Sequence, residues 1–211
     1  MRLIYIADPM CSWCYGFGKT VDALLASPGA AAPLQLALVM GGLRPYTTET
    51  LAAGRAEEIA GHWQHVHEAT GLPFETGPAG AMRQPGFVYD TEPASRATVA
   101  VRTHWPQHIW RYFKAVQQAF YADGRDVTQR DTLSAIAEET GLPRANFETA
   151  FDAEDTRLAT RQDFSQAQHW GIRGFPALLA EVSGDLHLVA HGYLPEADLR
   201  ERLAALPAPA H

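Results

Sequence analysis

The sequence lacks a long apolar run, a cluster of basic residues and any cysteine beyond Cys11 and Cys14. A membrane-spanning helix needs about 20 consecutive apolar residues, so we expect no membrane partner. Nucleic-acid-binding proteins present a basic face, whereas this chain has a formal net charge of −7, and we expect no nucleic-acid partner. Zinc needs about four ligands, often with further cysteines. The His104 and His108 pair lies about 90 residues from the cysteines in sequence, so we expect no metal.

A secretory signal is also missing from the beginning of the sequence. Met1-Arg2 leads directly into a strand, without the apolar stretch of about 7–15 residues and the cleavage site of a signal peptide. We therefore expect a cytoplasmic protein. Structural disulfides are unusual in that compartment, so a close cysteine pair there is typical of redox chemistry or metal binding.

The composition is that of a globular protein, with 46% hydrophobic and 19% charged residues. Hydrophobic periodicity predicts strands at 2–7 and 34–40 that flank a helix starting near Cys11 and ending at Ser27-Pro28-Gly29. Two strands around a helix form a parallel βαβ unit. From about residue 48 to 170 the pattern is helical, interrupted by a Gly/Pro-rich loop over 71–91. A β-hairpin over 177–190 and a helix from Pro195 complete the chain.

This order predicts an α/β fold with a helical insertion. Residues 1–47 and 166–211 would form the α/β domain, and residues 48–165 the all-helical insertion domain. A strand followed by Cys-x-x-Cys in a βαβ context is typical of a thioredoxin-like fold.

The segment Cys11-Ser12-Trp13-Cys14 carries the predicted chemistry. Positions i and i+3 share one face of the first helical turn, where the two sulfurs can approach closely. The positive end of a helix stabilises a thiolate, the nucleophile of thiol–disulfide exchange. We expect Cys11, nearer solvent, to attack and Cys14, one turn further on, to resolve the mixed disulfide. Ser12 would offer a hydroxyl or backbone N–H to the thiolate, and Trp13 an apolar platform for a peptide.

Two further segments are less specific. Asp8 stands three residues before Cys11 and is either a turn residue, which we favour, or a proton relay for Cys14. Gly174-Phe175-Pro176 precedes the hairpin, and a proline is common at the start of a strand. Arg44 and Glu92 would form a salt bridge or contact substrate.

Four segments together resemble the DsbA-like thioredoxin family, closest to its branch of predicted protein disulfide isomerases and cytosolic FrnE-type proteins. In chain order they are Tyr5-Ile6-Ala7-Asp8-Pro9-Met10-Cys11-Ser12-Trp13-Cys14, Gly41-Gly42-Leu43-Arg44, Tyr89-Asp90-Thr91-Glu92-Pro93-Ala94 and Gly171-Ile172-Arg173-Gly174-Phe175-Pro176-Ala177. The resemblance implies a thioredoxin-like fold with a helical insertion that overhangs the active site. It also implies that Pro176 is cis and faces the cysteines, and that the backbone of Phe175 docks an extended substrate.

The resemblance implies a thiol–disulfide oxidoreductase or protein disulfide isomerase acting on protein or peptide thiols and disulfides. No bound cofactor is expected, and glutathione or a thioredoxin-type reductant would recycle the pair. DsbA carries Pro-His between its cysteines where this chain has Ser12-Trp13, so the strong oxidising power of DsbA does not carry over. One alternative is a glutathione-dependent isomerase or transferase resembling the kappa-class glutathione transferases and 2-hydroxychromene-2-carboxylate isomerases. These usually have serine at the nucleophile position. The other is a non-catalytic peptide-binding module.

Overall fold

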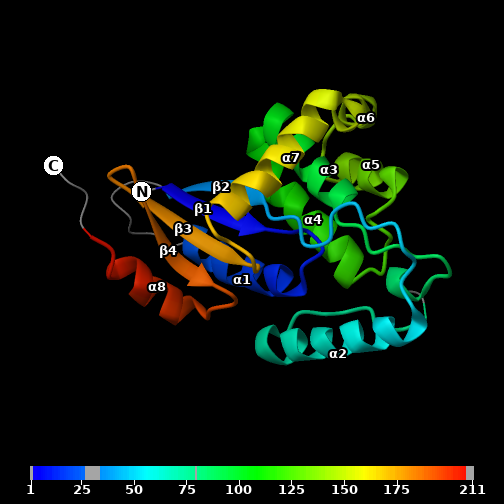
Figure 1. Ribbon diagram of the computed structural model, residues 1–211, viewed down its shortest axis with the longest axis horizontal. Coiled ribbons are helices and arrows are strands. Elements are labelled where there is room, and N and C mark those ends of the chain that lie inside the picture. Colours follow the sequence, from blue (N-terminus) through cyan, green and yellow to red (C-terminus); the bar gives the residue numbers. More distant parts are fainter. Residues whose placement is uncertain (1, 27–33, 79, 208–211) are drawn as a thin grey trace.

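The computed structural model describes residues 2–26, 34–78 and 80–207 (Figure 1). Four strands form one mixed sheet in the order β2-β1-β3-β4. Strand β1 (Arg2–Ala7) runs parallel to β2 (Gln35–Met40) and antiparallel to β3 (Ala177–Val182). Strand β4 (Asp185–His191) pairs with β3 at the edge of the sheet. The predicted parallel βαβ unit and the predicted hairpin are both confirmed.

Strand β1 is buried on both faces because it lies inside the sheet. Leu3 and Tyr5 point to the face covered by α1 (Ser12–Leu25) and α8 (Glu196–Ala204). Ile4 and Ile6 point to the opposite face, where they pack against the end of α7 (Glu154–His169). Side chains alternate across a strand, so a continuous apolar run such as Leu3–Ala7 requires cover on both sides. The predicted end of the first helix at 27–29 lies outside the described residues.

The segment between β2 and β3 is helical, as expected, and builds a core of its own. Its elements are α2 (Ala53–Thr70), a 3-10 turn at Ala81–Arg83, α3 (Glu92–His104), a 3-10 turn at Pro106–His108, α4 (Ile109–Tyr121), α5 (Arg130–Glu139), α6 (Arg144–Asp152) and α7. Within the stretch predicted to be helical, α4 is thus preceded by a separate 3-10 turn. Aromatic side chains dominate this core, among them Trp63, Tyr112, Phe120 and Phe147.

The observed architecture is the expected α/β fold with a helical insertion. Most inserted helices lie beyond one end of the sheet, and α2 lies at one edge of the molecule (Figure 1). Helix α7 runs continuously across residue 165, where we placed the end of the insertion. The division into domains at 47/48 and 165/166 stays a prediction.

An ion pair joins the helical segment to the sheet. The Arg102 guanidinium donates to both oxygens of Asp163, at 2.6 and 3.0 Å. Arg102 also donates to the carbonyl oxygen of Leu38 at 2.7 Å, and Asp163 accepts the N–H of Met40 at 2.8 Å. Both contacts are to β2, an edge strand with backbone groups left free by the ladder. Helices α3 and α7 are thereby fixed against this edge.

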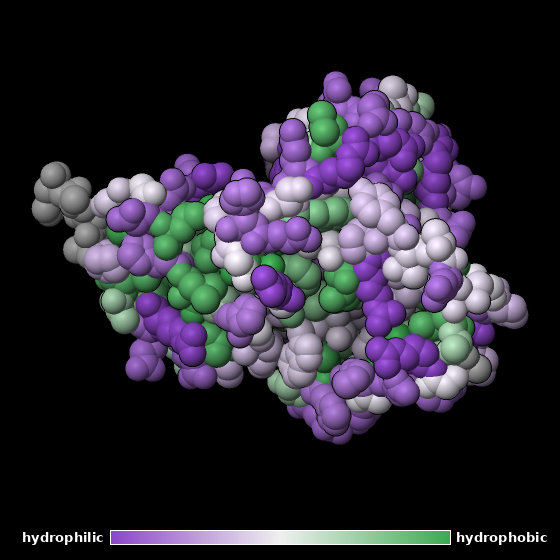
Figure 2. Space-filling view, viewed as in Figure 1, coloured by the Kyte–Doolittle hydropathy of each residue, from purple (hydrophilic) through white to green (hydrophobic). Residues whose placement is uncertain are grey.

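The surface differs between the two parts of the molecule. Figure 2 shows apolar residues gathered over the sheet, whereas the helices of α5–α7 present mainly hydrophilic residues on the same face. Two leucines of β4, Leu186 and Leu188, are exposed. Within the described ranges, none of the helices has the length and apolar character needed to cross a membrane.

Candidate active site

The two cysteines lie at the beginning of α1, where the sequence placed them. Cys11 is the N-cap residue with an extended backbone (φ −97°, ψ 115°), and Cys14 is in the first turn. The N–H of Cys11 donates to the carbonyl oxygen of Asp8 at 3.1 Å, which closes the turn between β1 and α1. Cys11 is 7% exposed and Cys14 is 0% exposed. The expectation that Cys11 is nearer solvent is confirmed.

Burial separates the chemistry of the two thiols. Desolvation raises the pKa of Cys14 well above its ordinary value, and a hydrogen bond with Cys11 and the charge of Cys11 raise it further. The influence of Cys11 on Cys14 agrees with their i, i+3 spacing, which places both side chains on one face of the helix. Cys14 therefore remains a protonated thiol at neutral pH.

Asp8 is a fully buried carboxylate that holds two loops together. Its Oδ1 accepts the N–H of Met10 at 2.8 Å, and its Oδ2 accepts the N–H of Leu43 at 2.7 Å. The first N–H belongs to the turn after β1 and the second to the turn after β2. Burial raises the pKa of Asp8 to about 6, and these two N–H groups oppose the rise. The favoured turn role of Asp8 agrees with this geometry.

The Phe175–Pro176 segment, which precedes β3, contacts the first of the two cysteines. The Phe175–Pro176 peptide bond is cis, as the resemblance implies. The thiol of Cys11 donates to the carbonyl oxygen of Phe175, with an Sγ···O distance of 3.6 Å. The carbonyl oxygen of Pro176 accepts the N–H of Gly192 at 2.8 Å, which ties this loop to the end of β4. Residues 164 positions apart in the chain are thus in direct contact at the thiol.

The side chain of Phe175 occupies space that Gly41 leaves free. A methyl group on Gly41 would lie 2.1 Å from Cε1 and 2.3 Å from Cζ of the Phe175 ring. Such distances are far below van der Waals contact, so the ring must move if residue 41 has a side chain. The lack of a side chain on Gly41, directly after β2, therefore allows the Phe175 ring to lie where it does.

We expect Gly41→Ala to lower the free energy of unfolding by about 1–2 kcal/mol, because overpacking forces the ring and its loop to shift. The measurement is urea unfolding followed by near-ultraviolet circular dichroism. The matched control is Gly61→Ala in α2, where no atom lies within 4 Å of the added methyl group. The control is expected to be neutral or slightly more stable, since alanine is the better helix former. Equal stability of Gly41→Ala and the wild type would contradict the close packing described here.

A cavity of about 400 Å³ opens beside Cys11. Its lining comes from five parts of the chain: Met10, Cys11, Ser12 and Trp13; Leu43 and Arg44; Ile59, His62 and Trp63; Tyr89; and Gly174 and Phe175. Most of these side chains are apolar or aromatic. A lining of this kind suits an extended apolar or aromatic segment next to the thiol.

The structure brings most of the expected site residues together. Ser12, Trp13 and Phe175 line the cavity with Cys11, whereas Asp8, Cys14 and Pro176 are not among the residues that line it. The Trp13 ring packs on Tyr193, with centroids 5.6 Å apart. Tyr193 comes from the loop after β4 and carries no signal in the sequence pattern.

Sequence reasoning missed the contribution of α2. Ile59 and Trp63 follow a helical stripe that indicates a core, and Trp63 is indeed buried in one. His62 lies beside them on the same helix and lines the cavity. The sequence carries no signal for this position, because it depends on how α2 packs against α1.

Arg44 and Glu92 differ in their surroundings. Glu92 pairs with Arg96 at 2.9 Å, so the salt bridge expected in this region exists for Glu92. Arg44 lies over the ring of Tyr89, 5.4 Å from its centroid, and lines the cavity. Arg44 therefore places a positive charge within reach of a substrate. Among the described residues, no cluster of three or more histidine, cysteine, aspartate or glutamate side chains is arranged to hold a metal ion.

Comparisons with known proteins agree with this geometry. Residues 3–204 match the model of the DSBA-like thioredoxin domain. A candidate protein disulfide isomerase from Nitrosomonas europaea has a similar structure, with 37% identity and a TM-score of 0.87 over 96% of this chain and 95% of that one. The cytosolic disulfide reductase DsbM from Pseudomonas aeruginosa is 26% identical, with a TM-score of 0.78 over 97% of both chains.

A more distant structure shares the fold alone. It is a 2-hydroxychromene-2-carboxylate isomerase, 13% identical, with a TM-score of 0.64 over 97% of this chain and 94% of that one. Among curated proteins, none matches the sequence significantly. The family match covers nearly the whole chain, and the cysteine pair stands at the start of the helix that follows β1. The chain therefore belongs to the DsbA-like thioredoxin family of thiol–disulfide oxidoreductases.

Proposed function

We propose that this protein exchanges disulfides with protein or peptide substrates through Cys11 and Cys14, as a disulfide reductase or isomerase. The observation that carries the proposal is the difference between the two thiols. Cys11 reaches the cavity at the start of a helix, whereas Cys14 is buried behind it with a raised pKa. Cys11 can thus react with a substrate, whereas Cys14 can react only with Cys11.

The exchange has two steps. The Cys11 thiolate attacks one sulfur of the substrate disulfide, forms a mixed disulfide and releases the other substrate sulfur as a thiolate. Cys14 then loses its proton and attacks Sγ of Cys11, which releases the second substrate sulfur and leaves a Cys11–Cys14 disulfide. Two electrons pass to the substrate, whose two sulfurs take up two protons. In the oxidising direction the same steps run in reverse.

The surrounding residues support these steps without reacting. Ser12, Trp13 and Phe175 line the cavity beside the thiol, and the cis bond to Pro176 sets the backbone direction after Phe175. The Phe175 carbonyl oxygen, which here accepts the Cys11 thiol, lies where an extended substrate chain would run. Asp8 is a positioning residue, because both of its oxygens already accept backbone N–H groups.

We propose glutathione or a thioredoxin-type reductant as the electron donor, and the cytoplasm as the location. The support is the similarity to DsbM, which is described as a cytosolic disulfide reductase and has a structure with GSH. The positive charge of Arg44 beside the cavity suits a small thiol that carries carboxylates. No other cofactor is proposed.

The alternative as a glutathione-dependent isomerase or transferase shares the fold but not the pattern of thiols. The isomerases and transferases of this type usually have a serine hydroxyl at the nucleophile position and use bound glutathione. Cysteines at both 11 and 14 instead favour thiol–disulfide exchange. A peptide-binding module without catalysis would use the same cavity and need neither thiol.

The test is insulin reduction in the presence of glutathione, together with refolding of scrambled ribonuclease. The matched control is the same protein after reduction and alkylation of both thiols. We expect the untreated protein to accelerate both reactions and the alkylated protein to accelerate neither. Equal activity of the two samples would overturn the proposal in favour of a binding module. A redox titration then gives the direction, since a potential near about −120 mV indicates an oxidant and one near about −270 mV a reductant.

A further inference from the structure

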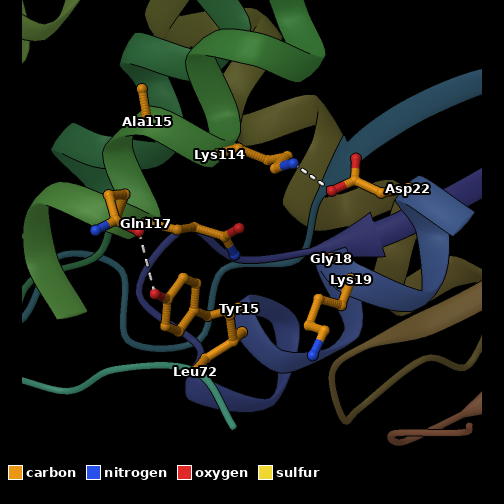
Figure 3. A pocket seen from close by; sticks show the side chains of 9 residues that line it. Tyr15, Gly18, Lys19, Asp22, Leu72, Lys114, Ala115 and Gln117 are labelled. Carbon is orange, nitrogen blue, oxygen red and sulfur yellow. Dashed lines mark hydrogen bonds and ion pairs between the residues drawn. The ribbon is translucent and has the colours of Figure 1, made fainter. Parts of the chain in front are cut away.

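A second cavity of about 350 Å³ lies between α1, α4 and the segment that follows α2 (Figure 3). Its lining consists of Tyr15, Gly18, Lys19, Asp22, Leu72, Lys114, Ala115, Gln117 and Gln118. It shares no residue with the cavity beside Cys11 and contains no sulfur. Small-molecule sites have volumes of about 300 Å³ or more, so this cavity is large enough for a small organic ligand. The redox mechanism uses no part of it.

A buried amide points into this cavity without a partner. Gln117 is 1% exposed, and its Nε2 donates no hydrogen bond to any described residue. Figure 3 shows the amide of Gln117 reaching from α4 toward α1 at Gly18. The nearest heavy atom to a methyl group on Gly18 would be Oε1 of Gln117, at 3.9 Å. The absence of a side chain at Gly18 therefore leaves open space beside the Gln117 amide, whose Nε2 lacks an acceptor.

The cavity also contains both lysines of the whole sequence, which otherwise uses arginine for its positive charges. Lys114 pairs with Asp22, and Asp22 also accepts the indole N–H of Trp110 at 2.8 Å. Lys19 donates to the carbonyl oxygen of Thr70 at 2.8 Å and forms no ion pair with a described carboxylate. One positive charge thus remains uncompensated at this end of the cavity.

The other end is apolar and rigid. The Tyr15 ring stacks on Tyr121, with centroids 5.1 Å apart and planes at 13°. The Tyr15 hydroxyl donates to Oε1 of Gln118 at 3.2 Å, which fixes the ring. The negative charge of Asp123 lies on this side and contributes to raising the pKa of Tyr15 to about 12, after burial. Leu72 also lines the cavity and packs against the apolar cluster that contains Tyr15, so this end suits an apolar group.

We propose that this cavity is a binding site for a small organic carboxylate. One carboxylate oxygen accepts a hydrogen bond from Nε2 of Gln117 and the other from Nζ of Lys19. The apolar body of the ligand rests against Tyr15 and Leu72, away from Lys19. This arrangement gives the buried amide its missing acceptor and the unpaired ammonium its counter-charge.

The test is a titration of the full-length protein with phenylacetate, using phenylacetamide as a ligand of the same shape without charge. The readout is the ¹⁵N–¹H signal of the Gln117 side-chain amide. We expect phenylacetate to shift this signal with a Kd on the order of millimolar, and phenylacetamide to bind at least about tenfold more weakly. Equal affinity of the two probes, or an unmoved Gln117 signal, would overturn the proposal.

Four variants sharpen the result. Lys19→Met keeps the side-chain stem and is expected to weaken phenylacetate binding at least about fivefold. Gly18→Ala fills the space beside Gln117 and is expected to weaken it by a similar factor, while Gly61→Ala on α2 leaves it unchanged. In Cys11→Ser the Kd is expected to equal that of the wild type, so this test is independent of the redox proposal. Unchanged binding in both Lys19→Met and Gly18→Ala would place the ligand elsewhere.

Discussion

Cys11→Ser is expected to lower the rate of insulin reduction at least about 10³-fold, because a serine hydroxyl does not ionise near neutral pH and cannot replace a thiolate. Cys11 is the thiol that lines the cavity, whereas Cys14 has no exposed surface. A substrate disulfide can therefore reach only the first sulfur. The measurement is the insulin turbidity assay at equal concentrations of folded protein.

Cys14→Ser is the matched partner of this variant and separates attack from resolution. Cys11 still attacks in Cys14→Ser, but the mixed disulfide has no internal thiol to release it. We expect a covalent adduct at Cys11 after incubation with oxidised glutathione or insulin, visible as a mass increase that a reductant removes. An adduct on Cys14 in Cys11→Ser, formed as fast and in the same yield, would show that the assigned order is wrong.

The part of the site that is local in sequence could be predicted from the sequence. Cys11 and Cys14 share one helical turn, and an apolar strand fixes where that turn begins. Backbone geometry alone then places the two sulfurs on one face. The continuous apolar run from Leu3 to Ala7 likewise indicated a strand, and β1 spans Arg2–Ala7 with Leu3 to Ala7 buried.

The part that depends on packing between distant elements could not be predicted. His62 reaches the cavity because α2 packs along α1, and no pattern in the sequence encodes that contact. The fit between Gly41 and the Phe175 ring joins residues 134 positions apart, so neither residue alone indicates it. The second cavity could not be predicted for the same reason. In the sequence Gln117 is an ordinary polar residue, and only the packing of α4 against α1 buries it.

Asp8 lies between these two cases, because its position before the cysteines is visible in the sequence but its burial is not. We expect Asp8→Asn to change how stability depends on pH. The pKa of Asp8 is raised from 3.8 to about 6 in the folded protein, chiefly by burial. The folded state then binds more protons than the unfolded state between these values, so this group's contribution to stability is lost as pH rises through about 6. From pH 4 to pH 7 the loss is about 2–3 kcal/mol.

Asparagine removes this contribution but also removes one acceptor. Its single carbonyl oxygen can serve the N–H of Met10 or that of Leu43, and the other N–H is left unpaired at a cost of about 1–3 kcal/mol. We therefore expect Asp8→Asn to be clearly less stable than the wild type at pH 4 and close to it at pH 7. The measurement is urea unfolding of both proteins across this range, with the Asp8 carboxyl ¹³C signal giving the midpoint directly.

Salt separates burial from surface charge as the cause of this pH dependence. Desolvation of a fully buried carboxylate is not screened by ions, whereas interactions between exposed charges weaken strongly at high ionic strength. The difference between wild type and Asp8→Asn should thus keep its pH dependence in about 0.5 M salt. A difference that is independent of pH would contradict the raised pKa and leave Asp8 as a turn residue that carries its charge at all these values. If the pH dependence of this stability difference disappears in salt, the effect comes from charges on the surface. The burial of Asp8 would then not be its cause.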